Sequence, residues 1–390
     1  MNVIYVDNNA TTMVAPEVLD AMLPYFSNYY GNPSSMHSFG GNVAAKIKTA
    51  RENVAKLIGA EPDEIIFTSC GTESDSTAIR AAIESYPDKK HIVTSRVEHP
   101  AVKNLFESLS KKGYRTTFVP VDNRGGLDID YLYDSLSDDT AIVSIMWGNN
   151  ETGVIFPIEE ISREVRSRGI VFHTDAVQIV GKIPIDVSKT AVHMLSLSGH
   201  KFHAPKGIGA LYVRKGTKFS PFMIGGHQEK GRRGGTENAA SIIGLGKAAE
   251  LAAGHLEANG YKPISQLRDK LERNLLNMIP NAMINGDPKN RLPNTSSVAF
   301  EYVEGEAILL MMNEHGICAS SGSACTSGSL EPSHVLRAMG VPFTAAHGSI
   351  RFSLSRYNTE DEIDKILEVL PPIIERLRAL SPFWKKAMSS

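Results

Sequence analysis

Short apolar runs alternate with amphipathic stretches between about residues 60 and 215. The intervening stretches 72–86 and 157–169 have the apolar spacing of helices, and the second ends in a glycine stop. The first six apolar runs end in polar or glycine-containing segments, which is typical of parallel strands buried on both faces. Seven runs are predicted to be strands: 64–69, 91–95, 116–121, 141–147, 170–176, 194–200 and 209–214. Repeated strand–helix alternation predicts an α/β fold with helices on both faces of the sheet.

The pattern changes after about residue 255. Residues 261–279 are predicted to form one helix, and 296–303 and 348–355 alternate as strands with one covered face. Residues 358–370 begin with a capping-box signature, and the two prolines that follow, at 371 and 372, are expected to break or kink that helix. The sequence therefore predicts a large α/β domain followed by a smaller α+β domain.

Composition and charge narrow the class of protein. The chain has 390 residues, 42% hydrophobic and 22% charged, as in an ordinary globular protein of about two domains. A formal net charge of −2 gives no field that favours nucleic acid. Three cysteines argue against a disulfide framework and indicate a reducing compartment. The N-terminus is unlike a signal peptide and no apolar run could span a membrane, so we expect a soluble cytoplasmic protein.

Polar residues that follow the predicted strands are the first candidates for chemistry, because ligands of open α/β sheets bind beyond the carboxyl ends of the strands. The run 64–69 leads through Gly71 into a helix, with Thr72 and Asp75 in a capping-box pattern. A glycine turn at a helix N-terminus can bind phosphate, and ordinary capping explains the same residues equally well. Asp175 ends another strand, where it could pair with a protonated ring nitrogen or cap a helix.

The densest group of polar residues follows the strand 194–200. A lysine at a strand end inside a pocket can lose solvation and become a free amine for Schiff-base chemistry, so Lys201 is a candidate for this role. The alternative is that Lys201 is a solvated lysine on the surface. Ser198 and Lys201 also match the S-x-x-K of penicillin-binding proteins, but the companion S-D-N and K-T-G motifs are absent from the sequence. His200 and His203 could be imagined as zinc ligands, although the spacing lacks a zinc-site frame.

Further candidates follow other strands. His99 could stack on a flat cofactor or transfer a proton, and Asn149 and Asn150 carry amides suited to a phenolic oxygen or a carboxylate. The loop 225–238 is glycine-rich and basic, and Arg351 could hold a substrate carboxylate or form a surface ion pair. The phosphate loops G-x-G-x-x-G after a strand and G-x-x-x-x-G-K-[ST] are both missing. Phosphate donors, an acid for a ring nitrogen, a stacking histidine and a lysine together fit pyridoxal phosphate.

The ordered segments also carry a family resemblance. "CGTESDS", "VEHPAV", "NNETG", "HTDAVQ" and "SGHKFHAPKGIG" resemble the class V aminotransferases, which have fold type I of the pyridoxal-phosphate enzymes. With "YVDNNATT", "YGNPSSMHSFG", "GRRGGTEN" and "SSGSACTSGSLEPSHVL", the chain resembles cysteine desulfurases of the NifS/IscS type, closer to the nitrogen-fixation branch. This resemblance covers essentially the whole chain. It implies a large pyridoxal-phosphate domain over 16–255 and a small domain formed by 1–15 with 256–390.

The resemblance also implies residue roles. Lys201 would form the Schiff base, Asp175 would pair with the pyridinium nitrogen, and His99 would stack on the ring and act as acid and base. Other positions would bind the cofactor: Asn150 and Gln178 near its phenolic oxygen, and Gly71, Thr72, Ser198, Gly199 and His200 around its phosphate. The implied assembly is a homodimer in which Thr236 reaches the phosphate of the other subunit. Arg351, with Asn150, would bind the substrate carboxylate.

The segment 320–329 holds Cys325 among serines and glycines that offer little packing, a composition that suits a swinging arm. In the family that it resembles, this cysteine accepts sulfur from L-cysteine as a persulfide and passes it to an iron–sulfur scaffold protein. An iron–sulfur cluster held in part by Cys325 would be transient rather than a stable metal site. Cys70 and Cys318 lie against apolar stretches and are expected to be inert buried thiols. The alternatives left open are a selenocysteine lyase, an aminotransferase of the same fold, and a non-catalytic iron–sulfur or metal donor.

Overall fold

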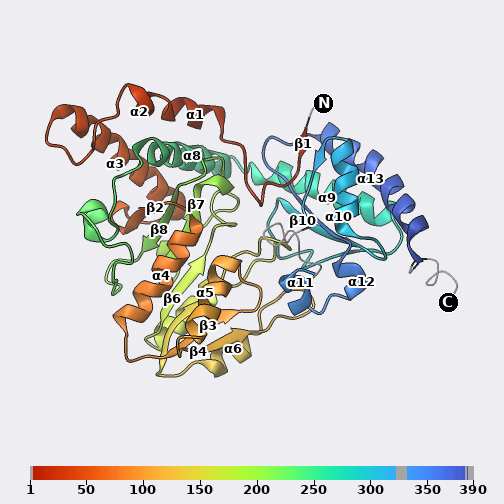
Figure 1. Ribbon diagram of the computed structural model, residues 1–390, viewed down its shortest axis with the longest axis horizontal. Helices are drawn as coiled ribbons and strands as arrows, with labels where there is room; N and C mark the ends of the chain where they lie inside the picture. Colours follow the sequence, from red (N-terminus) through yellow and green to blue (C-terminus); the bar gives the residue numbers. More distant parts are fainter. Residues whose placement is uncertain (1–2, 322–331, 383, 385–390) are drawn as a thin grey trace.

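A computed structural model describes residues 3–321, 332–382 and 384. Its largest sheet has seven strands in the order β2-β8-β7-β6-β5-β3-β4, and all of them are the strands predicted from the sequence (Figure 1). Six strands are parallel, and β8 pairs antiparallel with both of its neighbours. The strands are β2 (Ile65–Thr68), β3 (His91–Ser95), β4 (Arg115–Val119), β5 (Thr140–Ser144), β6 (Val171–Asp175), β7 (Met194–Ser198) and β8 (Gly209–Val213).

The reversed direction of β8 follows from the short connection before it. A parallel return needs a crossover of about a dozen residues or more, usually with a helix. Only residues 199–208 separate β7 from β8, and they hold one 3-10 turn, η3 (Gly199–Lys201). β8 therefore pairs back on β7, and the prediction of six parallel strands and an α/β sheet is confirmed.

Helices cover both faces of this sheet, as predicted. One face packs against α4 (Gly71–Ser85) and α5 (Pro100–Ser110). The other face packs against α1 (Pro16–Met22), α3 (Ser38–Ile58), α7 (Ile158–Ser167) and α8 (Ala239–Glu257). Strand side chains alternate between the two cores, so that Ile66 lies in the first and Phe67 in the second. The shorter elements here are α2 (Pro24–Ser27), α6 (Ile129–Ser135), η1 (Pro62–Glu64), η2 (Val187–Lys189) and η4 (Gln228–Gly231).

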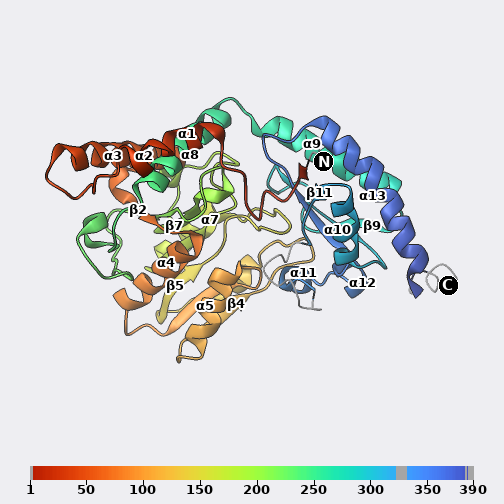
Figure 2. The same ribbon diagram turned by 45° about the horizontal axis from the view of Figure 1, so that its top comes forward.

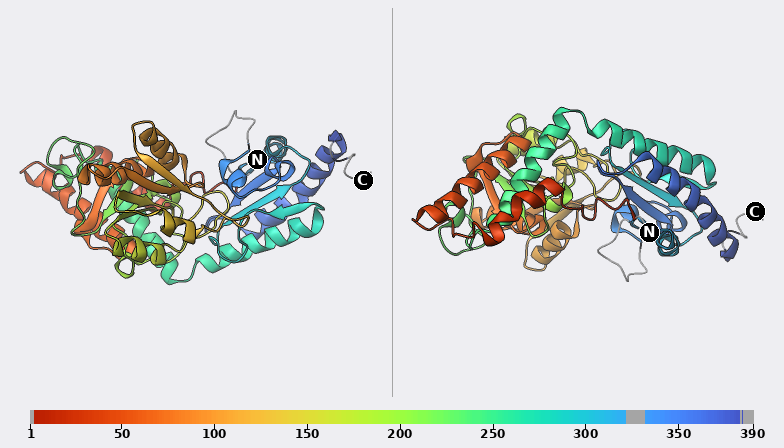
Figure 3. Two further views of the ribbon diagram at one scale, coloured as in Figure 1. Left: turned by 90° about the horizontal axis from the view of Figure 1, so that it is seen from below. Right: turned by 90° about the horizontal axis from the view of Figure 1, so that it is seen from above.

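A further core gathers residues from both ends of the chain. Ile4 and Val6 pack there with the long helices α9 (Tyr261–Met278) and α13 (Glu360–Leu380), which lie side by side (Figure 2). Its antiparallel sheet has the order β12-β10-β9, and β1 pairs parallel with β11. The remaining elements are β1 (Ile4–Tyr5), β9 (Ala282–Ile284), β10 (Thr295–Phe300), β11 (Ile317–Cys318), β12 (Ser349–Ser353), α10 (Gly305–Glu314), α11 (His334–Ala338) and α12 (Phe343–Ala346). The seven-stranded sheet and the sheet β12-β10-β9 lie side by side in an elongated molecule (Figure 3).

Helix signals in the sequence had mixed outcomes. The capping box of Thr359 and Glu362 is confirmed, since each side chain accepts a hydrogen bond from the backbone of the other. The expected break at Pro371 and Pro372 is wrong, because α13 continues to Leu380. Buried apolar side chains on both sides of the prolines, such as Leu370 and Ile374, hold the helix against the same core.

The capping box predicted for Thr72 and Asp75 is also wrong. α4 begins after Cys70 without a side-chain cap, and Asp75 is buried inside the protein. The thiols of Cys70 and Cys318 were expected to be buried, but both residues are half-exposed. Cys70 lies at the carboxyl end of the sheet, where it lines a cavity, and Cys318 ends a strand of two residues.

The close approach of α3 and α8 gives a stability test. A Cβ built on Gly246 would lie 2.4 Å from Cα of Ala50, whereas one on Gly254, in the same helix, meets nothing within 4 Å. We expect Gly246→Ala to lower the free energy of unfolding by about 1–3 kcal/mol because the helices must separate. Gly254→Ala should be neutral or stabilising by up to about 1 kcal/mol. Urea unfolding of both variants checks this, and equal effects would contradict the packing argument.

Candidate active site

A cavity of about 260 Å³ opens at the carboxyl ends of the parallel strands. It lies where β6 and β7 stop and where α4 and α5 begin, as expected for an open α/β sheet. Most of the site residues predicted from the sequence line it: Gly71, Thr72, His99, Asn150, Asp175, Gln178, Ser198, His200 and Lys201. Three predicted residues, Gly199, Thr236 and Arg351, do not line this cavity.

One end of the cavity is suited to an anion. Gly71 opens the 15-residue helix α4, whose first-turn amides point out of its N-terminus. A Cβ on Gly71 would lie 2.9 Å from Cγ2 of Val177, so glycine is required for the close approach. Among the described residues, the buried hydroxyl of Ser198 has no hydrogen-bond partner. A phosphate would supply the missing acceptor, and this end of the cavity therefore fits one.

Asp175 lies at the end of β6. Its Oδ1 accepts a hydrogen bond from the backbone N–H of Val177 at 2.9 Å. Burial raises the pKa of the carboxyl to about 6, although that hydrogen bond and the charge of Lys201 oppose the shift. A protonated ring nitrogen would stabilise the ionised carboxylate, so the residue fits the cationic ring of pyridoxal phosphate.

Two histidines face the cavity as neutral rings. Burial, helped by the charges of Lys201 and His334, lowers the pKa of His99 to about 4. Its Nδ1 accepts a hydrogen bond from Ala101 N at 3.1 Å, so the ring proton is on Nε2. Burial, with Lys201 as the next cause, also lowers the pKa of His200 to about 4. Near pH 7 neither ring adds positive charge, and His99 can donate the proton that it carries on Nε2.

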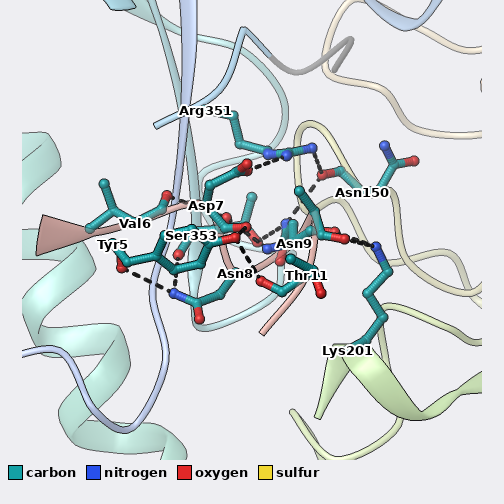
Figure 4. Close-up of polar contacts among 12 residues, drawn as sticks. Tyr5, Val6, Asp7, Asn8, Asn9, Thr11, Asn150, Lys201, Arg351 and Ser353 are labelled. Atoms are coloured by element: carbon teal, nitrogen blue, oxygen red, sulfur yellow. Dashed lines mark hydrogen bonds and ion pairs between the residues drawn. The ribbon is translucent and has the colours of Figure 1, made fainter. Parts of the chain in front are cut away.

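Lys201 follows β7 in the turn η3 and reaches the N-terminal segment. Its Nζ donates hydrogen bonds to the backbone oxygens of Asn9 at 2.6 Å and Ala10 at 2.7 Å (Figure 4). Gln178 donates from Nε2 to the same oxygen of Asn9 at 3.0 Å. The N-terminal segment thus lies directly against the amine on which the predicted chemistry depends.

Arg351 lies on β12, beside the cavity rather than in its lining. Its Nη2 forms an ion pair with Oδ1 of Asp7 at 2.7 Å, and its Nη1 donates to the backbone oxygen of Asn150 at 3.0 Å (Figure 4). Asn150 lines the cavity, so this contact places the guanidinium one residue away from it. Arg351 is buried, and the expectation of a surface ion pair is wrong.

Two other predicted residues lie apart from the cavity. Gly199 has a packing role, since a Cβ there would come within 3.0 Å of Ala204, Ile208 and Leu245. Thr236 lines a separate hollow near the ion pair of Arg233 with Glu73. Neither Gly199 nor Thr236 therefore belongs to the group of nine predicted residues that line the cavity.

Cys325 lies outside the described residues, but the segments that flank it reach the site. Ser320 exchanges backbone hydrogen bonds with Arg351. On the other flank, the hydroxyl of Ser333 donates to Glu151, and His334 hydrogen-bonds the backbone oxygen of Glu98. Both flanks are therefore anchored beside residues 98–99 and 150–151.

Sequence reasoning missed several residues of the site. Asn9 entered only through the segment that resembles the family, yet it contacts Lys201, Gln178 and Asn150. Asn149, by contrast, is a turn residue: its Oδ1 accepts from the backbone N–H groups of 151 and 152. Two buried asparagines in "YVDNNATT" were the available signal, since a buried amide requires several partners.

No metal centre accompanies this arrangement in residues 3–321, 332–382 and 384, where no group of three or more histidine, cysteine, aspartate or glutamate side chains could hold an ion. His200 and His203 instead hydrogen-bond Thr11 and Met13. Within the same described residues, no helix combines the length and apolar character needed to cross a bilayer.

The sequence matches the aminotransferase class V family over residues 4–366. The chain belongs to this family. It is 61% identical over 383 residues to a cysteine desulfurase of Trichormus azollae, covering 98% of this chain and 96% of the relative. It is 59% identical over 382 residues to the cysteine desulfurase NifS of Azotobacter vinelandii, covering 98% and 95%. A solved NifS-like protein superposes with a TM-score of 0.90 at 40% identity, covering 96% of this chain and all of that one. The family and fold type inferred from the sequence are confirmed.

The buried carboxyl of Glu98 predicts a pH dependence of stability. Burial raises its pKa from 4.5 to about 8. The folded protein therefore holds this proton more tightly, and the resulting stabilisation is lost as the pH rises towards about 8. Above pH 6.5, the ordinary pKa of histidine, the histidines with lowered pKa values no longer oppose this trend.

We expect the melting temperature of the wild type to fall between pH 6.5 and pH 8. The melting temperature of Glu98→Gln should fall less over the same interval. Thermal unfolding across this interval is the measurement. Glu314→Gln, a change at an exposed residue, is the control and should follow the wild type. Parallel curves for Glu98→Gln and wild type would contradict the raised pKa.

Proposed function

We propose that this protein is a pyridoxal-phosphate-dependent cysteine desulfurase, which converts L-cysteine to L-alanine and retains the sulfur as a persulfide on Cys325. The observation that carries the proposal is the meeting, in one cavity, of an anion-binding helix end, a buried acid and Lys201. The names of the relatives, cysteine desulfurases at 61% and 59% identity over nearly the whole chain, support the substrate.

The residues that would hold the cofactor divide by chemistry. Gly71, Thr72, Ser198 and His200 would bind the phosphate, and Asp175 the ring nitrogen. Gln178 and Asn150 would contact the phenolic oxygen, and His99 would stack on the ring. Bound pyridoxal phosphate supplies an electron sink for the bonds at the α-carbon of an amino acid.

The residues of this chain handle the protons. Lys201 would hold the cofactor covalently through its amine, which in this structure donates to the backbone oxygens of Asn9 and Ala10. Asp175, ionised beside a positive ring, keeps the ring nitrogen protonated. His99, neutral near pH 7, would donate its Nε2 proton, and the freed nitrogen would then accept one from the substrate or from the Cys325 thiol. An unperturbed thiol has a pKa of about 8.5 and needs such a base.

The sulfur step balances without an outside reductant. The Cys325 thiolate attacks the sulfur of the substrate, a sulfur–sulfur bond forms, and the carbon–sulfur bond breaks with its electron pair going to carbon. Protonation of that carbon gives L-alanine and leaves the persulfide on the enzyme. Support comes from the described residues on either side of the Cys325 segment, since Ser320 hydrogen-bonds Arg351 and Ser333 hydrogen-bonds Glu151. An iron–sulfur scaffold protein would then accept the sulfur, with any cluster held by Cys325 being transient.

The proposed assembly is a homodimer in which Thr236 completes the phosphate site of the partner subunit. Its support is the exposed apolar side chains beside it, at Phe222, Met223 and Ile224, where Gly234 N donates to Met223 O. Residues 16–255 would form the cofactor domain, and 1–15 with 256–390 the small domain, because Ile4 and Val6 pack in the core of α9 and α13. The cytoplasmic location predicted from the cysteine count stays a prediction.

The reaction and the acceptor thiol are tested together. Purified protein with pyridoxal phosphate, L-cysteine and a thiol reductant should yield alanine and sulfide in equal amounts. Cys325→Ala should yield almost neither, while still changing the visible absorbance when L-cysteine binds. Cys70→Ala, which removes a half-exposed thiol that lines the cavity, is the control and should retain activity. Keto-acid or alanine formation that ignores Cys325→Ala would point to another class V reaction.

The role of Arg351 gives a separate prediction. We expect Arg351→Ala to raise the KM for L-cysteine by about 10- to 100-fold with a smaller change in kcat, because a charge-assisted pair to the carboxylate is lost. Arg356→Ala, which removes a nearby guanidinium that stacks on Tyr357, is the control. Steady-state kinetics separates the two parameters, and a lower kcat at unchanged KM would assign Arg351 to another role.

A further inference from the structure

Lys182 reaches the two amides that lie closest to the proposed catalytic lysine. It follows β6 in a turn that places it four residues after Gln178, so that the two side chains are neighbours. Its Nζ lies 2.5 Å from Oε1 of Gln178 and 2.9 Å from Oδ1 of Asn9. Among the described residues, no carboxylate forms an ion pair with Lys182. Its two contacts are therefore both with amide oxygens.

The contacts of Lys182 determine which way both amides face. In its charged form Lys182 donates hydrogen bonds and cannot accept them, which selects the oxygen of each amide. The NH2 group of Gln178 is then directed away from Lys182. Its Nε2 donates to the backbone oxygen of Asn9 at 3.0 Å, and Gln178 lines the cavity of about 260 Å³. The NH2 group of Asn9 is directed to the backbone oxygen of Asn150 at 3.1 Å and to Thr295 at 2.9 Å.

The turn that carries Lys182 is held rigidly. Gly181 has a φ of +77°, and a Cβ there would lie 2.8 Å from Cβ of Phe202, the residue after Lys201. The backbone N–H of Ile179 and of Lys182 donate within the turn. The position of the Lys182 amine is therefore coupled to the backbone beside Lys201 rather than to a mobile loop.

We infer that Lys182 is a positioning residue, which fixes the Gln178 amide so that its NH2 group is presented to the cofactor cavity and holds Asn9 against Lys201. This inference rests on the proposed function, because Gln178 would donate to the phenolic oxygen of the cofactor. Lys182 itself does not line that cavity. It lines a second hollow of about 50 Å³, on the other side of Lys201.

Burial and the charged groups around Lys182 disfavour its charged form. Burial, and then the positive charges of Lys201 and Arg351, lower the pKa of Lys182 well below its usual range. His200 and His203 also face it, and the Lys182 charge is among the causes that lower their pKa values. A cation surrounded by other cations is costly, and the two amide oxygens offset this cost. Removal of Lys182 would release both amides at once.

The test uses holoenzyme and the pH midpoint at which its visible absorbance band changes. A hydrogen-bond donor to the phenolic oxygen, and a nearby cation, both favour the deprotonated form and lower this midpoint. We expect Lys182→Met to raise the midpoint by about one pH unit. Lys182→Arg, which keeps a donor-only cation, should restore most of the difference. Lys189→Met, at an exposed lysine of the same region, is the control and should match the wild type.

A double variant separates orientation from charge. If Lys182 acts through Gln178, then Lys182→Met should add little to the shift already produced by Gln178→Met. An unchanged midpoint in Lys182→Met, or a full additional shift in the double variant, would overturn the inference while leaving the proposed function intact. A wild-type protein without a visible band after addition of pyridoxal phosphate would instead overturn the proposed function, and this inference with it.

Discussion

Asn9 connects the part of the chain that carries the seven-stranded sheet with the part that carries the sheet β12-β10-β9. All of its polar atoms form hydrogen bonds. Its backbone oxygen accepts from Lys201 and Gln178, and its side-chain oxygen accepts from Lys182 and Asn294. Its two nitrogens donate to Asn150, Thr295 and Ser353. Because a buried amide that loses a partner costs about 1–3 kcal/mol, this residue fixes the separation of the two parts of the chain. The cavity, the amine of Lys201 and the guanidinium of Arg351 all depend on that separation.

The sheet explains why the other functional side chains converge. Six parallel strands end at one edge, so residues that follow different strands, such as Asp175 and Lys201, meet although the chain separates them. The start of α4, His99 before α5 and the N-terminal segment line the cavity at this edge. Burial then shifts pKa values in opposite directions: that of His99 falls and that of Asp175 rises. One enclosure thus provides a neutral base and a readily protonated acid near pH 7.

The sequence was most informative where local pattern and topology coincide. The seven strands follow from apolar runs, and the cavity residues were found because each stands at a strand end. Long-range packing could not be predicted in this way. Asp75 resembles a capping residue, but it lies inside the protein, where its Oδ1 is 3.6 Å from Nε2 of His173 on β6. Pro371 and Pro372 should end a helix, but apolar contacts on both sides keep α13 continuous. The role of Asn9 could not be predicted in full, because its partners Lys201, Thr295 and Ser353 lie far away in the sequence.

Groups of like charge gather in and around the cavity. Asp75, Glu98 and Asp175 influence one another, and burial raises the pKa of each carboxyl. Lys182, Lys201 and Arg351 form the corresponding cationic group, since the last two lower the pKa of the first. A ligand with a positive ring nitrogen on one side and anionic groups on the other would relieve both repulsions together. Binding of such a ligand would therefore offset the cost of keeping like charges together.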